Sequence, residues 1–186
     1  MNFKKHIIIL TVSALVFAPS CASEKTSDTD TTVDFSEFLP KTEKLLFSNG
    51  ETESALIGDD TYAVRFSSEK ELYSFELSAF SESEKGSVRL TLYKWKGDYQ
   101  TTVSEEKYTE HLLFPLFPKE EDVTPFVVFA LSDRLVAGDY LAVLSSNGTD
   151  AEILLGKKTD DTNSGIVCYK NGVEFDKAPC AVIEFK

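Results

Sequence analysis

Turn-forming residues recur at short, regular intervals along this chain of 186 residues. Asn-Gly pairs stand at 49–50 and 171–172, and Gly-Asp pairs begin at Gly58, Gly97 and Gly138. Both kinds of pair tolerate the backbone angles of tight turns, and a spacing of roughly ten residues is typical of an all-β sandwich or barrel. This spacing of turn-forming residues therefore predicts short strands joined by tight turns.

Between the turns, alternating apolar and polar residues predict half-buried strands. The segment 73–80 (YSFELSAF) places Tyr73, Phe75, Leu77 and Ala79 on one face, and the segment 87–92 (SVRLTL) places Val88, Leu90 and Leu92 on one face. The segment 125–131 (PFVVFAL) is apolar throughout, which predicts a central strand covered on both sides. Residues 36–44 and 104–110 have room for only a turn or two of helix. We predict an all-β fold over residues 37–186, a single antiparallel β-sandwich of about nine strands.

The first 20 residues have the order of regions found in an export signal. Lys4 and Lys5 precede an apolar run from Ile7 to Ala18, and the residues after it are small. The run is shorter than the roughly 20 residues that a membrane-spanning helix needs. We therefore predict a signal peptide over residues 1–20.

The residues APSC, which end at Cys21, resemble the lipobox of bacterial lipoproteins. In that family, small residues precede a Cys that is acylated and becomes the N-terminus after cleavage. The resemblance implies an extracytoplasmic protein of the bacterial cell envelope, anchored to a membrane by lipid on Cys21. Cleavage by an ordinary signal peptidase at a later residue is the alternative. Residues 21–36 are rich in Ser, Thr and Asp, which predicts a flexible linker between the anchor and the sandwich.

The net charge at pH 7 is −12, and the loss of Lys4 and Lys5 with the signal peptide would make it −14. Nucleic acids and anionic lipid head groups bind basic patches, whereas the basic residues here are scattered among more numerous carboxylates. The composition therefore speaks against nucleic acid as a partner.

Three segments resemble the jelly-roll β-sandwich modules that accompany secreted bacterial carbohydrate-active proteins. They are residues 87–103 (SVRLTLYKWKGDYQTTV), 135–145 (LVAGDYLAVLS) and 168–172 (CYKNG). The resemblance implies a jelly-roll topology and a binding or accessory role, and it brings no ligand residues with it.

Tyr93, Trp95 and Tyr99 are the candidate ligand-binding residues. The alternation that buries Leu92 turns Tyr93 and Trp95 outward, and Tyr99 follows just after the turn at Gly97. An exposed aromatic ring can stack on the apolar face of a sugar. The alternative is that a second sheet or the loop 111–118 (HLLFPLFP) covers these rings, so that they only pack.

Acidic residues in turns raise the question of a structural calcium ion, because calcium binds clustered carboxylates and loop carbonyls. The candidates are Asp59, Asp60, Asp98, Asp160 and Asp161. Acidic turns are equally typical of soluble β-proteins, so the sequence leaves the metal unknown. We predict no other cofactor.

Catalytic motifs are absent from the sequence. His111 is the single His after residue 20, and no nucleophile–base motif, zinc motif or phosphate loop is present. We therefore predict that the protein is not an enzyme.

Cys168 and Cys180 are the two cysteines besides Cys21. In an exported protein such a pair predicts a disulfide, and the alternative is two small buried side chains that never meet.

Three functions are compatible with the sequence. The first is a membrane-anchored, non-catalytic binding or accessory module, with carbohydrate as the ligand class that the aromatics favour. The second is a structural or protein-partner-binding envelope lipoprotein, which an apolar patch or an unpaired edge strand would favour. The third is a small hydrolase, which would need carboxylates that converge in a pocket.

Overall fold

The computed structural model describes residues 43–119, 125–146, 150–159 and 165–185, without the side chains of 132–134. These residues belong to one compact unit, Phe38–Lys186. The predicted signal peptide, Cys21 and the whole predicted linker lie outside the described residues. Among those described, no helix has the length and apolarity to span a membrane.

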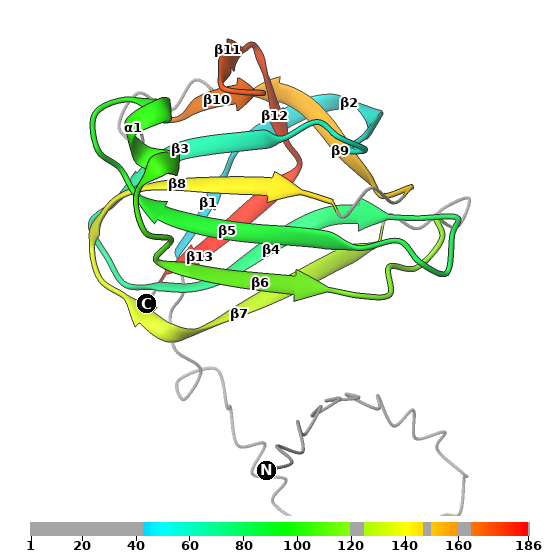
Figure 1. Cartoon of the computed structure of the whole chain (residues 1–186), viewed down its shortest axis with the longest axis horizontal. Helices are drawn as coiled ribbons and strands as arrows, with labels where there is room; N and C mark the ends of the chain where they lie inside the picture. Colours follow the sequence, from blue (N-terminus) through cyan, green and yellow to red (C-terminus); the bar gives the residue numbers. More distant parts are fainter. Residues whose placement is uncertain (1–42, 120–124, 147–149, 160–164, 186) are drawn as a thin grey trace, which may run out of the picture. The chain divides into compact units, whose positions relative to one another are not determined.

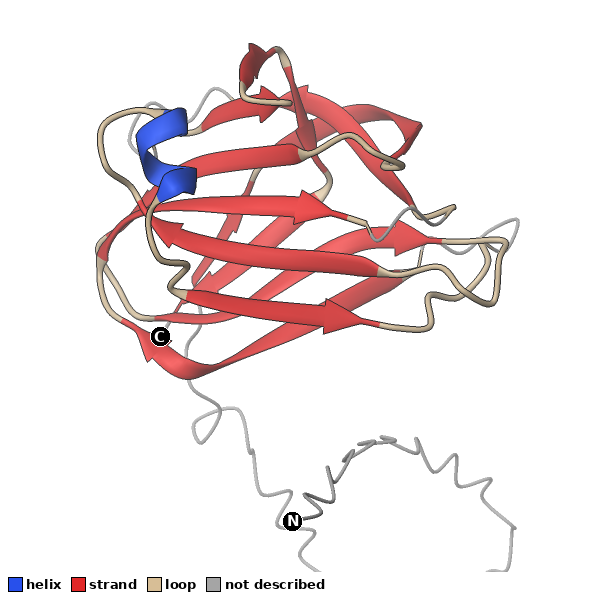
Figure 2. Cartoon of the chain, in the orientation of Figure 1, coloured by secondary structure: helices blue, strands red, loops and turns tan. Residues whose placement is uncertain are grey.

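The described residues form thirteen strands and one short helix, drawn in Figures 1 and 2. The elements are β1 (Glu43–Leu46), β2 (Ser48–Leu56), β3 (Tyr62–Ser68), β4 (Leu72–Phe80), β5 (Val88–Lys94), α1 (Tyr99–Ser104), β6 (Thr109–Leu113), β7 (Phe126–Leu135), β8 (Gly138–Ser145), β9 (Glu152–Lys158), β10 (Val167–Lys170), β11 (Val173–Phe175), β12 (Lys177–Pro179) and β13 (Ala181–Phe185).

Two antiparallel sheets pack face to face, so the predicted all-β sandwich is confirmed (Figure 1). The six-stranded sheet has the order β11-β10-β3-β8-β5-β6. The seven-stranded sheet follows the path β1-β13-β4-β9-β12, with β7 also paired to β4 and β2 also paired to β9. The prediction of about nine strands was too low, because β1, β10, β11 and β12 are pieces of only three or four residues.

Single residues at two points let the chain change partner strands within the seven-stranded sheet. Only Phe47 separates β1 from β2, and only Cys180 separates β12 from β13. The Cys180 amide donates to the Leu154 carbonyl of β9 at 2.8 Å, while its carbonyl accepts from the Ser78 amide of β4 at 2.9 Å. The chain therefore leaves β9 and joins β4 at Cys180 without losing backbone hydrogen bonds.

Aromatic and aliphatic side chains from both sheets fill the space between them. The ring of Phe47 contacts the ring of Phe66 on the opposite sheet, with centroids 5.5 Å apart. Val88, Leu90 and Leu92 are fully buried, as the alternation in 87–92 predicts. Burial of this apolar surface is the main favourable contribution to folding.

Two predictions about side-chain exposure were wrong. A register shift between Leu72 and Ser74 turns Tyr73 out of the expected face, so that Leu72 is buried and Tyr73 is 46% exposed. Among the described residues the apolar segment 125–131, most of β7, pairs only with β4 and is not a central strand. Phe126 and Val128 on its outer side are 58% and 52% exposed.

The helical segments were also misplaced. The helix α1 ends at Ser104, where the sequence predicts a helix to begin, and the described end of the segment 36–44 lies in β1. The Asn-Gly pair at 49–50 is no hairpin turn. It forms a bulge inside β2, where Gly50 adopts a φ of 75°.

Candidate ligand-binding site

A small apolar cluster lies on the outer face of the six-stranded sheet, separate from the core between the sheets. Its buried members are Ala63, Leu141, Val143 and Tyr169, and Tyr93, Trp95, Tyr99, Val103 and Val167 pack against them while staying partly exposed. We call the four rings of Tyr93, Trp95, Tyr99 and Tyr169 the aromatic cluster.

Strand alternation explains why these rings share one face. Leu92 on β5 and Cys168 on β10 point into the main core, so the next residues, Tyr93 and Tyr169, point outward. Tyr169 was not among the residues predicted from the sequence, although the same alternation next to Cys168 is visible there. Tyr93 and Trp95 lie on the outer face that the alternation predicts.

The rings of the aromatic cluster contact one another closely. Trp95 stacks on Tyr169 with centroids 6.3 Å apart and planes inclined by 29°, and Tyr99 lies 5.1 Å from the same Tyr169 ring. The helix α1, which carries Tyr99 and Val103, packs on this cluster, a cover that was not predicted from the sequence. Tyr93, Trp95 and Tyr99 are therefore packed and partly accessible at the same time, whereas Tyr169 is buried.

A hydrogen-bonded cap fixes α1 beside the end of β5. The Asp98 carboxylate accepts a hydrogen bond from the Thr101 amide at 2.9 Å, which holds the pKa of Asp98 below its ordinary value. The buried Thr102 hydroxyl donates to the Asp98 carbonyl at 2.6 Å and accepts from the Lys96 amide at 3.0 Å. These bonds position Tyr99 in the aromatic cluster.

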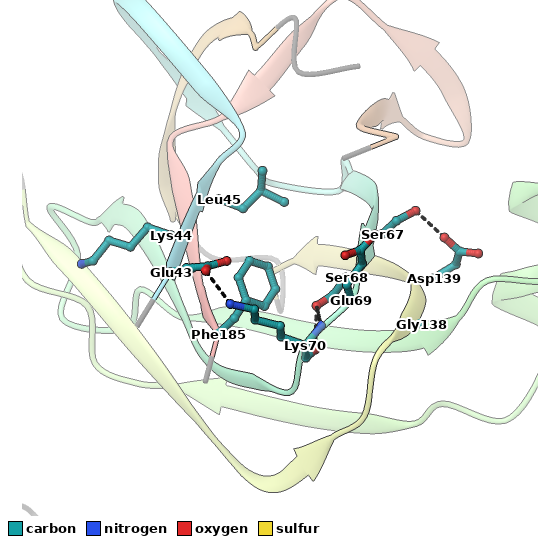
Figure 3. Close-up of a pocket in the computed structure, with 10 residues that line it drawn as sticks. All are labelled: Glu43, Lys44, Leu45, Ser67, Ser68, Glu69, Lys70, Gly138, Asp139 and Phe185. Carbon is teal, nitrogen blue, oxygen red and sulfur yellow. Dashed lines mark hydrogen bonds and ion pairs between the residues drawn. The ribbon is translucent and has the colours of Figure 1, made fainter. Parts of the chain in front are cut away.

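A pocket of about 710 Å³, lined mostly by residues with a charged or hydroxyl group, opens at the end of the sandwich where β1, β13, β8 and the β3–β4 turn meet (Figure 3). Its lining residues are Glu43, Lys44, Leu45, Ser67, Ser68, Glu69, Lys70, Gly138, Asp139 and Phe185. The Lys70 ammonium pairs with the Glu43 carboxylate, and the Ser67 hydroxyl donates to the Asp139 carboxylate. We call this site the end pocket.

The end pocket borders the aromatic cluster along two neighbouring strands. Ser67 lies two residues after Arg65 on the same face of β3, and the Arg65 guanidinium lies 5.2 Å from the centre of the Trp95 ring. The Trp95 amide also donates to the Asp139 carbonyl at 2.9 Å. The hydroxyl and charged groups of the pocket and the rings of the cluster thus belong to adjoining surfaces.

A second pocket, of about 310 Å³, lies on the outer face of the seven-stranded sheet and has mainly apolar walls. Leu46, Phe126, Leu154 and Val182 contribute apolar side chains to it, and the Cys180 thiol forms part of its lining. Leu46 is 52% exposed, and the side chains of Phe126 and Val128 continue the apolar surface along β7. We call this surface the apolar face.

The predicted disulfide is not formed in the structure, where both cysteines are free. Cys168 is buried in the main core from the six-stranded sheet, and burial raises the pKa of its thiol to about 12. Cys180 lies in the seven-stranded sheet, where its sulfur accepts a hydrogen bond from the Ser48 hydroxyl at 3.2 Å. The two thiols have separate packing environments, which their spacing in the sequence does not reveal.

The acidic turns that raised the question of calcium serve other contacts. Within the described ranges, no group of three or more His, Cys, Asp or Glu residues could hold a metal ion. Asp60 accepts a hydrogen bond from Asn171 at 2.6 Å and pairs with Lys170 at 2.8 Å, and Asp98 caps α1. Asp59 is exposed. Asp160 and Asp161 lie outside the described residues.

His111 lies on β6, away from the end pocket lining. Its ring is 3.2 Å from the Thr109 hydroxyl and contacts the ring of Phe129, with centroids 6.4 Å apart. These contacts give His111 a packing environment at the edge of the sandwich.

Comparison of the chain with protein-family models, with curated proteins and with solved structures gave no match.

Proposed function

We propose that the protein is a lipid-anchored, non-catalytic binding module of the bacterial cell envelope, and that it binds carbohydrate. The observation that carries this proposal is the adjacency of the end pocket and the aromatic cluster. The end pocket offers hydroxyl, carboxylate and ammonium groups, and the aromatic cluster offers rings that are partly accessible.

Carbohydrate suits such a surface because each sugar ring has apolar CH faces and a rim of hydroxyl groups. The CH faces pack on aromatic rings, and the hydroxyl groups exchange hydrogen bonds with polar side chains. Ser67 and Asp139, at the boundary of the two surfaces, supply both a hydroxyl group and a carboxylate.

The pocket's polar groups can exchange hydrogen bonds with a ligand. The Glu43 carboxylate is paired with Lys70, and the Asp139 carboxylate accepts from the Ser67 hydroxyl. A lipid anchor on Cys21 followed by a flexible linker would raise the local concentration of such a module at the envelope.

A glycan array probed with the mature protein tests the proposal. We expect wild type to bind at least one glycan class, and Trp95→Ala and Ser67→Ala each to weaken that signal. Tyr73→Ala is the matched control, because Tyr73 is an exposed aromatic residue on the other sheet. Absence of glycan binding, or equal loss with the Tyr73 control, would count against a carbohydrate site at this surface.

The apolar face supports a second candidate function, the docking of a protein partner. Leu46, Phe126 and Val128 are each more than half exposed and lie beside an apolar pocket, and β7 is an edge strand among the described residues. Exposed apolar patches and edge strands are typical of interaction sites.

A further inference from the structure

We propose that the carbohydrate bound at this site carries a carboxylate, as a uronic acid does, and that Arg65 binds it. This inference rests on the proposed function and specifies the ligand class of the same surface. It starts from the state of the Arg65 side chain.

Arg65 has a stacking partner but, within the described part of the chain, no acidic ion-pair partner. Its guanidinium carbon lies 5.2 Å from the centre of the Trp95 ring, and its buried Nε has no hydrogen-bond partner. No carboxylate of the described residues lies within ion-pair distance of it. A buried donor without a partner is costly, so the Arg65 side chain is not fully satisfied by the described residues.

Arg89, on the same sheet, differs from Arg65 because it has an acidic neighbour. Its guanidinium lies 4.0 Å from the Glu110 carboxylate, which also pairs with Lys107 at 2.9 Å. The chain has 31 acidic and 19 basic residues, so a guanidinium without an ion-pair partner among the described residues runs against the composition. Arg65 therefore differs from Arg89 in a way that the supply of acidic side chains does not explain.

The geometry selects a carboxylate attached to a sugar ring. A guanidinium that is held against an aromatic ring keeps an N–H edge free, and that edge matches the two oxygens of a carboxylate. Trp95 lies against the Arg65 guanidinium, Tyr169 stacks on Trp95, and Tyr99 contacts Tyr169. Such rings favour the apolar face of a sugar ring.

The charges around the site disfavour a more highly charged ligand. The Glu174 and Asp98 carboxylates act on Tyr169 together with Arg65, and Asp139 lies across from Ser67 on the next strand. A phosphate group or a cluster of sulfates would meet more of this repulsion than a single carboxylate does. One carboxylate on an otherwise neutral sugar ring is balanced by Arg65 alone.

The test compares matched pairs of ligands on the mature protein by isothermal titration calorimetry. The ligands are trimers that contain one uronate unit (galacturonate, glucuronate or mannuronate) and two neutral sugar units, each as the free acid and as the methyl ester. The ester keeps the ring and removes the charge. We expect wild type to bind the acid form of at least one trimer about 10-fold or more tightly than its ester, the scale of one hydrogen bond to a charged group.

Variants then assign the preference to Arg65. Arg65→Gln should abolish the preference for the acid while leaving ester binding within about 2-fold. Arg65→Lys should keep a reduced preference, because lysine keeps the positive charge but lacks the paired N–H donors of the guanidinium. Arg89→Gln, the matched control, should leave the preference intact. If Arg65→Gln fails to fold, the Arg65→Lys result alone decides: a full, wild-type preference would overturn the inference.

Failure of this inference is distinguishable from failure of the proposed function. Equal binding of acid and ester, or a preference that survives Arg65→Gln, would overturn the role of Arg65 while leaving carbohydrate binding in place. Binding of neutral glycans alone on the array would likewise overturn the role of Arg65 and leave carbohydrate binding in place. Absence of binding to every glycan, neutral or acidic, would overturn both.

Discussion

The indole ring of Trp95 stacks on the ring of Tyr169 across the outer face of the six-stranded sheet, with centroids 6.3 Å apart. The contact joins the end of β5 to β10, two strands that are not neighbours in the sheet. Trp95 therefore contributes to the packing of the domain on one side and to the proposed ligand surface on the other, so its removal should affect both properties.

Trp95→Ala should lower the free energy of unfolding by about 2 kcal/mol, less than the roughly 3 to 5 kcal/mol lost when a fully buried aromatic residue becomes Ala. The reason is that Trp95 is only partly buried and loses its stacking on Tyr169. Urea unfolding followed by circular dichroism measures the change. Trp95→Phe, which keeps a ring, is the matched control and should lose less. No loss of stability with Ala would mean that the stacked contact contributes nothing to the fold.

The sequence predicted the sandwich because alternation and turn residues act locally. Val88, Leu90 and Leu92 alternate with polar residues, and a two-residue period needs no knowledge of the rest of the chain to be read. The same two-residue period predicted that Tyr93 and Trp95 point outward. Local patterns thus predicted both the fold class and the face of the sheet on which the candidate residues lie.

The errors come from features that depend on distant residues. The segment 125–131 is apolar on both faces, which fits a covered central strand and an exposed edge strand equally, and only the pairing with β4 decides. The cover that α1 gives the aromatic cluster was missed because Gly97-Asp98 was read as a turn. Asp98 was in fact the helix cap, with Thr101 three residues later.

Thiol titration should find both Cys168 and Cys180 free in the mature protein after denaturation without reductant. In the native protein at pH 8, Cys168 should resist alkylation, because burial raises its pKa to about 12 and leaves almost no thiolate. Cys180 is less buried and should react first. Two blocked thiols that appear only after reduction would establish the disulfide that the structure lacks.

Four carboxyl groups should make the domain less stable in acid. Their pKa values are lowered, in each case chiefly by a hydrogen bond: Asp60 from Lys170, Asp98 from the Thr101 amide, Glu110 from Lys107 and Glu184 from Lys44. A lowered pKa in the folded state contributes stability above the ordinary values of 3.8 and 4.5, and that stability is lost as the pH falls below them.

The melting temperature should therefore change little between about pH 7 and pH 5.5 and should fall below about pH 4.5. Differential scanning calorimetry across this range measures it. Glu184→Gln should flatten part of the acid slope because it removes one of the four groups, whereas Glu82→Gln, in the loop after β4, is the exposed control. An acid slope unchanged by Glu184→Gln would exclude a contribution from the Lys44 contact.

The N-terminus of the mature protein should be an acylated Cys21. Intact mass spectrometry of protein extracted from the membranes of its native host should show the loss of residues 1–20 and the addition of acyl chains. Cys21→Ser should release the protein from the membrane fraction, since two or more acyl chains are what holds such a protein there. An unmodified N-terminus at Ala22 or later would contradict lipidation.

The apolar face gives the protein-partner alternative its own test. Phe126→Ser and Val128→Ser should change the free energy of unfolding by no more than about 0.5 kcal/mol, because both side chains are already more than half exposed in the folded state. If a partner docks there, the double variant should lose that partner in crosslinking from intact cells. Trp95→Ala should keep it, because Trp95 lies on the other sheet.

Glycan binding lost with Trp95→Ala but retained with the double variant would assign function to the aromatic cluster. The opposite result would assign it to β7 and make protein partnership the better description of this domain.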